Sequence, residues 1–267
     1  MSPGRRADAK LSLVLPAYDE AERLPRTLEA FLAYLPDDPA LTELVVVDDG
    51  STDATGELAE QVAARDQRVR VLRTGVNRGK GAAVRRGMLA AGGDLLVFTD
   101  ADGSYGPGQV ERIARALVEA PVAIGVRRAE LLGGRSAGGG SARLVRQVAS
   151  RAFNLAQRSV LGLPFADTQC GLKGFRRDAA RAIFGRAALD GFAFDAEALF
   201  LAVRLGLGVV EVPVRAEERD GSKVRLALDA VRMLREMGQV RRAAARGVYD
   251  AEPTLPAPGE VTPPMGL

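Results

Sequence analysis

Short apolar runs alternate with segments of helical period along this chain, and this alternation limits the possible folds more than any other feature. The runs occupy residues 10–16, 44–47, 69–72, 94–99, 122–125 and 209–214, and helical patterns separate them, as at about 21–35, 82–91 and 107–119. Strands and helices that alternate at this spacing form βαβ units with parallel strands. We therefore predict an α/β fold with a mostly parallel central sheet and helices on both faces.

Acidic or polar turns follow three of the predicted strands, at residues 18–20, 48–53 and 100–102. Ligands of open parallel sheets bind outside the carboxyl ends of the strands. We expect these three turns to converge on one crevice.

Asp100 and Asp102 follow the strand predicted at residues 94–99. If extended geometry continues past Thr99, both carboxylates point to one side, because side chains two residues apart share a face of a strand. Two converging carboxylates suit Mg²⁺ or Mn²⁺, which takes its other ligands from water and substrate phosphate. The alternative is a polar turn that caps the next segment.

The glycine-rich segment 75–81 lacks the spacing of a P-loop, and no GxGxxG motif follows a strand. Gly79 and Gly81 can form a tight turn into a helix, which would leave its first amides and Lys80 near the crevice for a diphosphate. A plain structural turn fits this segment equally well.

Charge is unevenly distributed along the chain. Residues 1–125 hold 15 Lys and Arg against 19 Asp and Glu, whereas residues 126–250 hold 22 against 13. The second half should therefore meet anions such as phosphorylated substrates or acidic lipids. Nucleic acid is disfavoured, because this half has few aromatic residues for stacking and no recognisable nucleic-acid motif. The chain has no histidine, so its chemistry must use carboxylates, Arg and Lys.

Basic amphipathic helices are predicted at residues 141–161 and 226–246, and either an acidic membrane or the protein core could cover their apolar faces. The glycine-rich segment 133–140 before them is a lid or a linker. Asp195 could cap the helix that it opens, with Glu197 in the first turn.

The predicted domain covers residues 10–246. We expect a disordered arm at 1–9, which lacks the apolar region of a signal peptide, and a disordered proline-rich tail at 247–267. The single cysteine, Cys170, indicates a reducing compartment. No run reaches the roughly 18 apolar residues that span a bilayer, so we expect that the chain by itself is not an integral membrane protein.

Seven segments, in order, resemble the family 2 glycosyltransferases of the GT-A fold. They are residues 13–20 (LVLPAYDE), 46–53 (VVDDGSTD), 77–81 (NRGKG), 100–102 (DAD), 167–173 (DTQCGLK), 194–197 (FDAE) and 221–224 (GSKV). The chain is most similar to transferases that move glucose or mannose to dolichyl or polyprenyl phosphate. The last three segments look most like the dolichyl-phosphate β-glucosyltransferases, which use UDP-glucose.

This resemblance implies a nucleotide-sugar half at residues 10–125 and an acceptor half at residues 126–246. It also implies roles for individual residues. The nucleotide-sugar would be bound by Pro16, Tyr18, Glu20, Asp49, Lys80 and Asp100; the metal by Asp102 and Asp100; and the acceptor phosphate by Arg127, Arg135, Arg143, Arg146 and Lys223. Asp195 would contact a sugar hydroxyl or the acceptor, unless it only caps its helix. Asp100, Asp102, Asp195 and Arg127 form the implied catalytic set.

The resemblance implies an inverting transfer of a hexose from a UDP-sugar to a polyprenyl phosphate by a single displacement assisted by Mg²⁺ or Mn²⁺. Many such transferases carry transmembrane helices, so we expect peripheral attachment at the cytoplasmic face of the membrane or a separate membrane subunit. One alternative is a soluble or cell-envelope hydroxyl acceptor with Asp195 or Glu197 as base. Another is a non-catalytic nucleotide-sugar-binding protein.

Overall fold

The computed structural model describes residues 9–38, 40–127, 159–216 and 226–253, with the backbone alone for 226–234. The strands are β1 (Leu11–Ala17), β2 (Thr42–Asp48), β3 (Val69–Arg73), β4 (Leu95–Phe98), β5 (Val122–Arg127), β6 (Lys173–Arg176) and β7 (Val209–Val214). The helices are α1 (Leu24–Tyr34), α2 (Thr55–Ala63), α3 (Lys80–Ala90), α4 (Pro107–Ala116), α7 (Arg177–Phe184), α8 (Phe194–Arg204) and α9 (Leu226–Ala245), followed by a 3-10 helix at Val248–Asp250.

The strands form one sheet in the order β3-β2-β1-β4-β6-β5-β7. Neighbouring strands are parallel except at β6, which runs antiparallel to β4 and β5. The mostly parallel sheet confirms the predicted fold class. Strand β6 was not among the strands predicted from the sequence.

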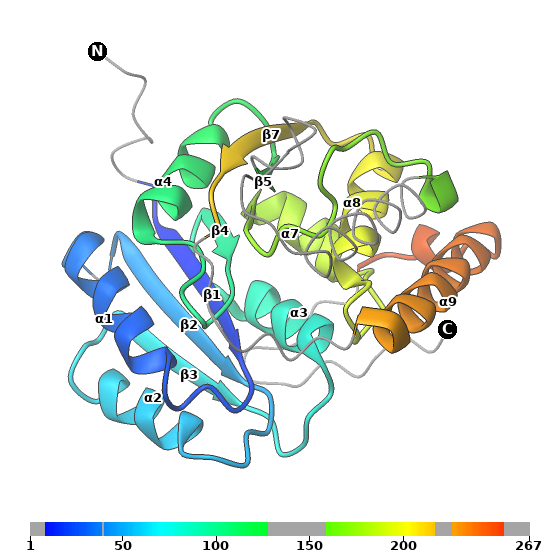
Figure 1. The fold of residues 1–267 in the computed structure, drawn as a ribbon. Helices are drawn as coiled ribbons and strands as arrows, with labels where there is room; N and C mark the ends of the chain where they lie inside the picture. Colours follow the sequence, from blue (N-terminus) through cyan, green and yellow to red (C-terminus); the bar gives the residue numbers. More distant parts are fainter. Residues whose placement is uncertain (1–8, 39, 128–158, 217–225, 254–267) are drawn as a thin grey trace, which may run out of the picture.

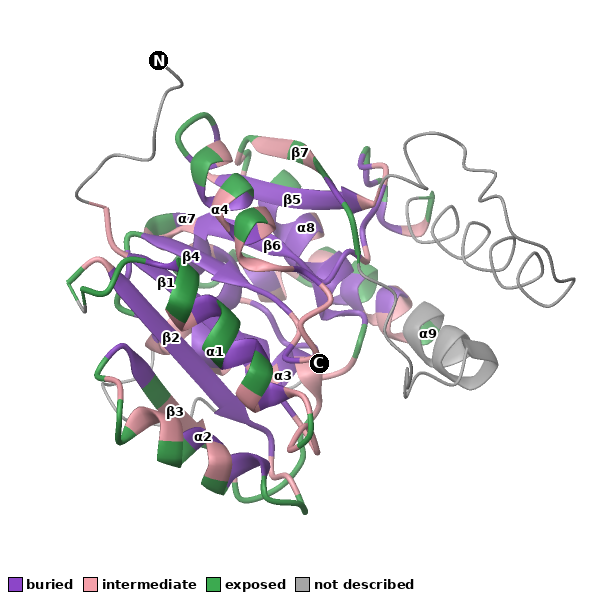
Figure 2. Cartoon of the chain, turned by 60° about the vertical axis from the view of Figure 1, so that its left-hand side comes forward, coloured by how far each residue is buried: buried purple, intermediate pink, exposed green. Residues whose placement is uncertain are grey.

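Helices cover both faces of the sheet, as predicted (Figure 1). The alternation of side chains along β1 divides the core: Leu13 and Leu15 pack in one cluster with residues of α1 and α4, and Val14 packs in the other with residues of α3, α7 and α8. Figure 2 shows this burial, with β1 and β2 buried along their length and the outer faces of α1 and α4 exposed. The central strands are therefore fixed from both sides.

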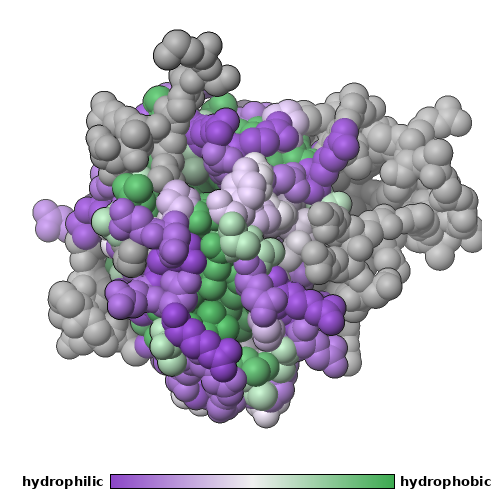
Figure 3. All heavy atoms as spheres, turned by 90° about the vertical axis from the view of Figure 1, so that its left-hand side faces the viewer, coloured by the Kyte–Doolittle hydropathy of each residue, from purple (hydrophilic) through white to green (hydrophobic). Residues whose placement is uncertain are grey.

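The surface over the left-hand side of Figure 1 is mainly hydrophilic, with a narrow hydrophobic band between charged and polar side chains (Figure 3). Within the described part of the chain, no helix combines the length and the apolar character needed to cross a membrane.

The prediction of a disordered tail at residues 247–267 is wrong for the first residues of that range. Val248–Asp250 form a 3-10 helix, and Tyr249 is almost wholly buried against the core of α8. The tail from residue 254, the arm up to residue 8, the glycine-rich segment 133–140 and most of the helix predicted at 141–161 lie outside the described residues. The division into donor and acceptor halves stays a prediction.

Candidate active site

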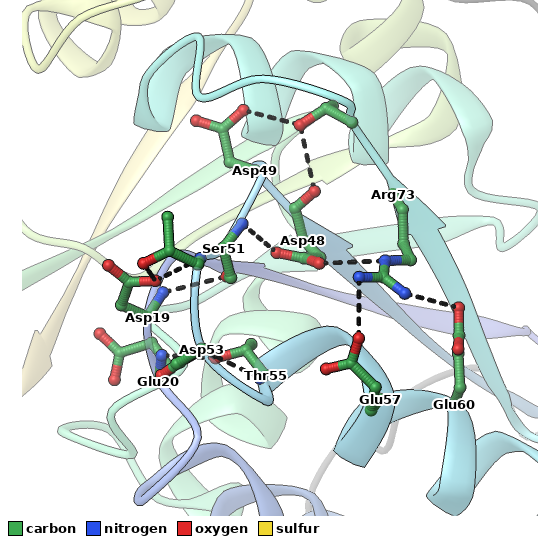
Figure 4. A network of polar contacts seen from close by, with 12 residues as sticks. Asp19, Glu20, Asp48, Asp49, Ser51, Asp53, Thr55, Glu57, Glu60 and Arg73 are labelled. Atoms are coloured by element: carbon green, nitrogen blue, oxygen red, sulfur yellow. Dashed lines mark hydrogen bonds and ion pairs between the residues drawn. The ribbon is translucent and has the colours of Figure 1, made fainter.

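The turns after β1 and β2 contact each other at the carboxyl edge of the sheet. Ala17 and Asp48 are register partners, so both strands end at the same level. The backbone N–H of Asp19 donates to Ser51 Oγ at 3.0 Å, and that of Glu20 donates to Thr55 Oγ1 at 2.7 Å (Figure 4). These hydrogen bonds join the two turns, as the sequence predicted.

Asp19 has a left-handed backbone, with φ of 52°, which is unusual for a residue other than glycine. Its Oδ1 accepts the N–H of Thr52 at 2.7 Å. Asp53 similarly binds the N–H groups of Ala21 and Thr55. The sequence analysis gave Asp19 and Asp53 no separate role, although aspartate beside Ser, Thr and Gly is a typical signal for such local hydrogen bonds.

Three of the predicted donor-site residues lie at this edge with their side chains partly exposed: Pro16, Tyr18 and Glu20. The Glu20 carboxylate is already paired, since it accepts two hydrogen bonds from Arg23, at 2.6 and 2.7 Å. A ligand that meets Glu20 would therefore meet an ion pair.

Asp49 holds the segment 75–81 in place. Its carboxylate is buried and accepts the N–H groups of Arg78 and Gly79, the latter at 2.7 Å. Burial raises the pKa of Asp49, and these hydrogen bonds offset that shift only in part. The proposed contact of Asp49 with the nucleotide stays a prediction, but its loop-holding contacts are present in the structure.

The amides of Gly81 and Ala82 in the first turn of α3 are not left open for a phosphate, which favours the alternative of a plain structural turn. The N–H of Gly81 donates to the carbonyl oxygen of Asp190 at 2.8 Å, and the N–H of Ala82 points to the same oxygen at 3.4 Å. The loop before α8 therefore caps α3.

Asp100 and Asp102 lie in a tight turn and not on a continued strand. Strand β4 ends at Phe98, and the N–H of Gly103 returns to the carbonyl of Asp100 at 3.4 Å. The strand alternation that we used to align the two carboxylates is therefore wrong, although both side chains remain partly exposed. Asp102 Oδ1 accepts the N–H of Ser104 at 2.9 Å, and its charge also acts on Arg23.

Lys80, at the start of α3, forms an ion pair with Asp100. Burial alone would lower the pKa of Lys80, but the charges of Asp100 and Asp195 outweigh that effect and raise it. Lys80 is thus a cation held beside the end of β4 by Asp100, and its contact with the nucleotide-sugar stays a prediction.

Asp195 is not a helix cap. The N-cap position of α8 is Ala193, without a side-chain capping bond, and Asp195 Oδ1 accepts Lys173 Nζ at 2.6 Å. Both partners are buried, and burial raises the pKa of Asp195 although Lys173 attracts its charged form. Sequence reasoning missed Lys173 as a partner, because nothing in the sequence brings residues 173 and 195 together.

Arg127 forms a two-pronged ion pair with Asp167, whose Oδ2 accepts Nε at 2.7 Å and whose Oδ1 accepts Nη2 at 3.0 Å. Burial would raise the pKa of Asp167, but the guanidinium outweighs it and lowers that pKa. The Arg127 side chain is still 36% exposed, so a phosphate could reach it. The other predicted acceptor-site residues, Arg135, Arg143, Arg146 and Lys223, lie outside the described residues.

A divalent metal fits the end of β4 if a diphosphate completes its ligands. The described residues contain no group of three or more carboxylate or thiol side chains that could hold a metal alone. Asp102, however, uses one carboxylate oxygen for Ser104, and its other oxygen has no hydrogen-bond partner in the described chain. Mg²⁺ typically takes one or two protein carboxylates and phosphate oxygens.

Comparisons with known proteins agree with this geometry. Residues 12–184 match the model of glycosyl transferase family 2. The chain is 39% identical over 229 residues to a dolichyl-phosphate β-glucosyltransferase of Drosophila melanogaster, covering 80% of this chain and 69% of the relative. It is 36% identical over 211 residues to an undecaprenyl-phosphate mannosyltransferase of Micrococcus luteus, covering 78% of this chain and 83% of the relative.

Solved structures share the fold. Glucosyl-3-phosphoglycerate synthase of Mycobacterium tuberculosis in complex with UDP matches with a TM-score of 0.65 at 22% identity, covering 88% of this chain and 81% of that one. Mannosyl-3-phosphoglycerate synthase of Rubrobacter xylanophilus matches with a TM-score of 0.66 at 20% identity, covering 97% and 83%. These similarities show that the chain has a GT-A-like fold. The match to the family model shows that this chain belongs to glycosyltransferase family 2.

Proposed function

We propose that this protein transfers a hexose, which we take to be glucose, from a UDP-sugar to a polyprenyl or dolichyl phosphate with inversion at the anomeric carbon. The observation that carries the proposal is the meeting of Lys80, Asp100 and Asp102 at the end of β4, beside the joined turns after β1 and β2. Relatives named for lipid-phosphate glucosyl and mannosyl transfer support the acceptor class.

In the proposed donor site, Tyr18 and Glu20 bind the nucleotide at the partly exposed edge. Asp102 holds Mg²⁺ or Mn²⁺ through its unpartnered oxygen, and Asp100 lies beside it, paired with Lys80. When bound, the metal supplies positive charge to the diphosphate as the sugar leaves. Lys80 adds a fixed cation, and such preorganised charges stabilise the developing negative charge of UDP.

A phosphate acceptor suits the described acids better than a hydroxyl acceptor does. A hydroxyl needs a base near the reacting carbon, whereas a phosphate monoester is already ionised at neutral pH. Glu197 is fully buried and accepts three hydrogen bonds, and Asp195 is buried in its pair with Lys173. Neither carboxylate is accessible to act as a general base, so we favour a phosphate acceptor that is bound by cations such as Arg127.

We also propose that the protein works at the cytoplasmic face of a membrane. The basic second half and the lipid nature of the proposed acceptor support this location. Flotation with vesicles that contain about one-third anionic lipid tests it, with neutral vesicles as control. Protein that stays unbound at low salt with both vesicle types contradicts peripheral attachment.

The function is tested by release of the nucleoside diphosphate, UDP from UDP-glucose and GDP from GDP-mannose, with other nucleotide sugars beside them. Each donor is tried with and without undecaprenyl or dolichyl phosphate, in Mn²⁺ and in EDTA. We expect metal-dependent release from UDP-glucose that needs the lipid phosphate. Release that needs a hydroxyl acceptor would support the alternative transferase, and no release with any pair would reject catalysis.

A further inference from the structure

Helix α8 opens with two buried acids, Asp195 and Glu197, whose contacts face the protein interior. We infer that they are positioning residues that hold Lys80 against Asp100, one by charge and one through the loop at residues 188–190. The inference rests on the proposed function, because it gives Lys80 and Asp100 a role in donor binding.

The first route is electrostatic, through a series of side chains that alternate in charge from the core to the partly exposed end of β4. Lys173 Nζ is anchored by Asp195 Oδ1 and by the carbonyl of Cys170, each at 2.6 Å. Side-chain exposure rises along the series: 0% for Lys173, 5% for Asp195, 22% for Lys80 and 31% for Asp100. Charges act strongly on one another where water is excluded. Asp195, fixed by Lys173, therefore attracts Lys80 from the buried side.

The second route runs through the loop that precedes α8. Glu197 accepts the N–H groups of Ala188 and Leu189, both at 2.9 Å, and the hydroxyl of Tyr249 at 2.8 Å. A carboxylate that receives three hydrogen bonds in the interior fixes the segments that donate them. Glu197 thus orients the backbone of this loop.

The same loop fixes the start of α3. The carbonyl of Asp190 accepts the N–H of Gly81 at 2.8 Å. A Cβ at Gly79 would lie 2.5 Å from that carbonyl oxygen, and one at Gly81 would lie 2.6 Å from the carbonyl oxygen of Leu189. The two glycines therefore allow the loop to touch α3 on both sides of Lys80, and the position of Lys80 depends on the loop that Glu197 holds.

A merely structural role for the two acids would affect folding but not Lys80 in particular. A double-mutant cycle separates the two cases. Asp195→Asn and Glu197→Gln are made in the full chain and again with Lys80→Met, and UDP affinity is measured by calorimetry in Mn²⁺. In the chain with Lys80, we expect each of these two substitutions to weaken UDP binding about tenfold. In the Lys80→Met background, each should weaken it less than about twofold. Phe31→Leu, a buried change on the opposite face of the sheet, is the control and should have the same effect in both backgrounds.

A second measurement needs no nucleotide. The chain has only four lysines, so ¹⁵N-lysine labelling gives few ammonium resonances, and Lys80→Met identifies that of Lys80. Asp195→Asn and Glu197→Gln should each shift this resonance, whereas Phe31→Leu should not. If Glu197→Gln does not fold, Tyr249→Phe replaces it, because it removes one hydrogen bond to Glu197.

The outcomes separate this inference from the proposed function. A wild-type protein that binds no UDP contradicts the proposed function, and the Lys80 resonance still decides the positioning role. An unmoved resonance, or equal losses of affinity in both backgrounds, overturns the inference.

Discussion

Gly171 and Asp100 lie so close that no side chain fits between them. A Cβ at residue 171 would collide with Asp100 Oδ2 and lie 3.1 Å from its carboxyl carbon. Lys80 holds the same carboxylate from α3. The segment DTQCGLK therefore shapes the site at the end of β4, which explains why glycine stands in the middle of that segment.

Gly171→Ala should move the Asp100 carboxylate away from Lys80. We expect kcat/KM to fall by about 100-fold, because displacements near 1 Å at a reacting site can have effects of this size. Thermal unfolding should change little, since the displaced atoms are at the end of a side chain. Gly75→Ala is the control, because a Cβ there meets nothing within 4 Å. Equal kcat/KM for the two variants would contradict the prediction.

Asp102→Ala should abolish turnover in a folded protein, because it removes the carboxylate oxygen that is open to a metal. Calorimetry should show UDP binding that no longer responds to Mn²⁺. The control is Ser104→Ala, which keeps the backbone N–H that Asp102 accepts. Near-normal activity of Asp102→Ala would remove the metal assignment.

The sequence predicted the features that depend on local pattern. The alternation of β-branched runs with helical segments predicted the parallel strands. The parallel direction of those strands in turn predicted that the turns after β1 and β2 lie together. Strand β6 was missed because its four residues, KGFR, are too few and too polar to show a period. Its first three residues are nevertheless buried, since β4 and β5 flank it, and Arg176 is partly exposed.

Contacts between distant segments could not be predicted in the same way. The pairing of Lys173 with Asp195 depends on how β6 and α8 pack. One of the three partners of Glu197, the hydroxyl of Tyr249, lies 52 residues further along the chain. Proline content suggested a disordered tail around Tyr249, but burial of that aromatic ring outweighs the composition of its neighbours.

Tyr249→Phe tests that contact. The variant keeps the ring but removes the hydroxyl that donates to the buried Glu197. We expect the free energy of unfolding to fall by about 1 to 3 kcal/mol, as for other buried groups that lose a partner. Urea unfolding measures it. Tyr34→Phe, whose hydroxyl binds Glu111 at the exposed surface, should lose less than about 1 kcal/mol.

Lys173→Met should leave the buried Asp195 carboxylate without its hydrogen-bonded cation. We expect a loss of about 3 to 5 kcal/mol in the free energy of unfolding, the usual cost of breaking a buried pair from one side. Replacing both partners, with Lys173→Met and Asp195→Leu, should cost less. Arg204→Met, which breaks the exposed pair with Asp250, should cost under about 1 kcal/mol. Similar losses for Lys173→Met and Arg204→Met would show that the buried charge is tolerated.

Arg127→Met should reverse the pH dependence that Asp167 contributes. In the wild type, Arg127 lowers the pKa of Asp167 below its unfolded value. Its contribution to stability is therefore present above the unfolded pKa of about 3.9 and is lost as the pH falls through the folded value. Without the guanidinium, burial of the fully covered Asp167 should raise its pKa. Its contribution should then be present at low pH and lost as the pH rises through the raised value.

The stability difference between the wild type and Arg127→Met should accordingly widen from pH 4 to pH 7. We expect about 2 to 3 kcal/mol at pH 7, less than for a wholly buried pair because Arg127 is partly exposed. Urea unfolding at intervals across this range measures the difference, with Arg204→Met as the variant whose difference should stay constant. A constant difference for Arg127→Met would mean that Asp167 does not depend on Arg127 for its charge.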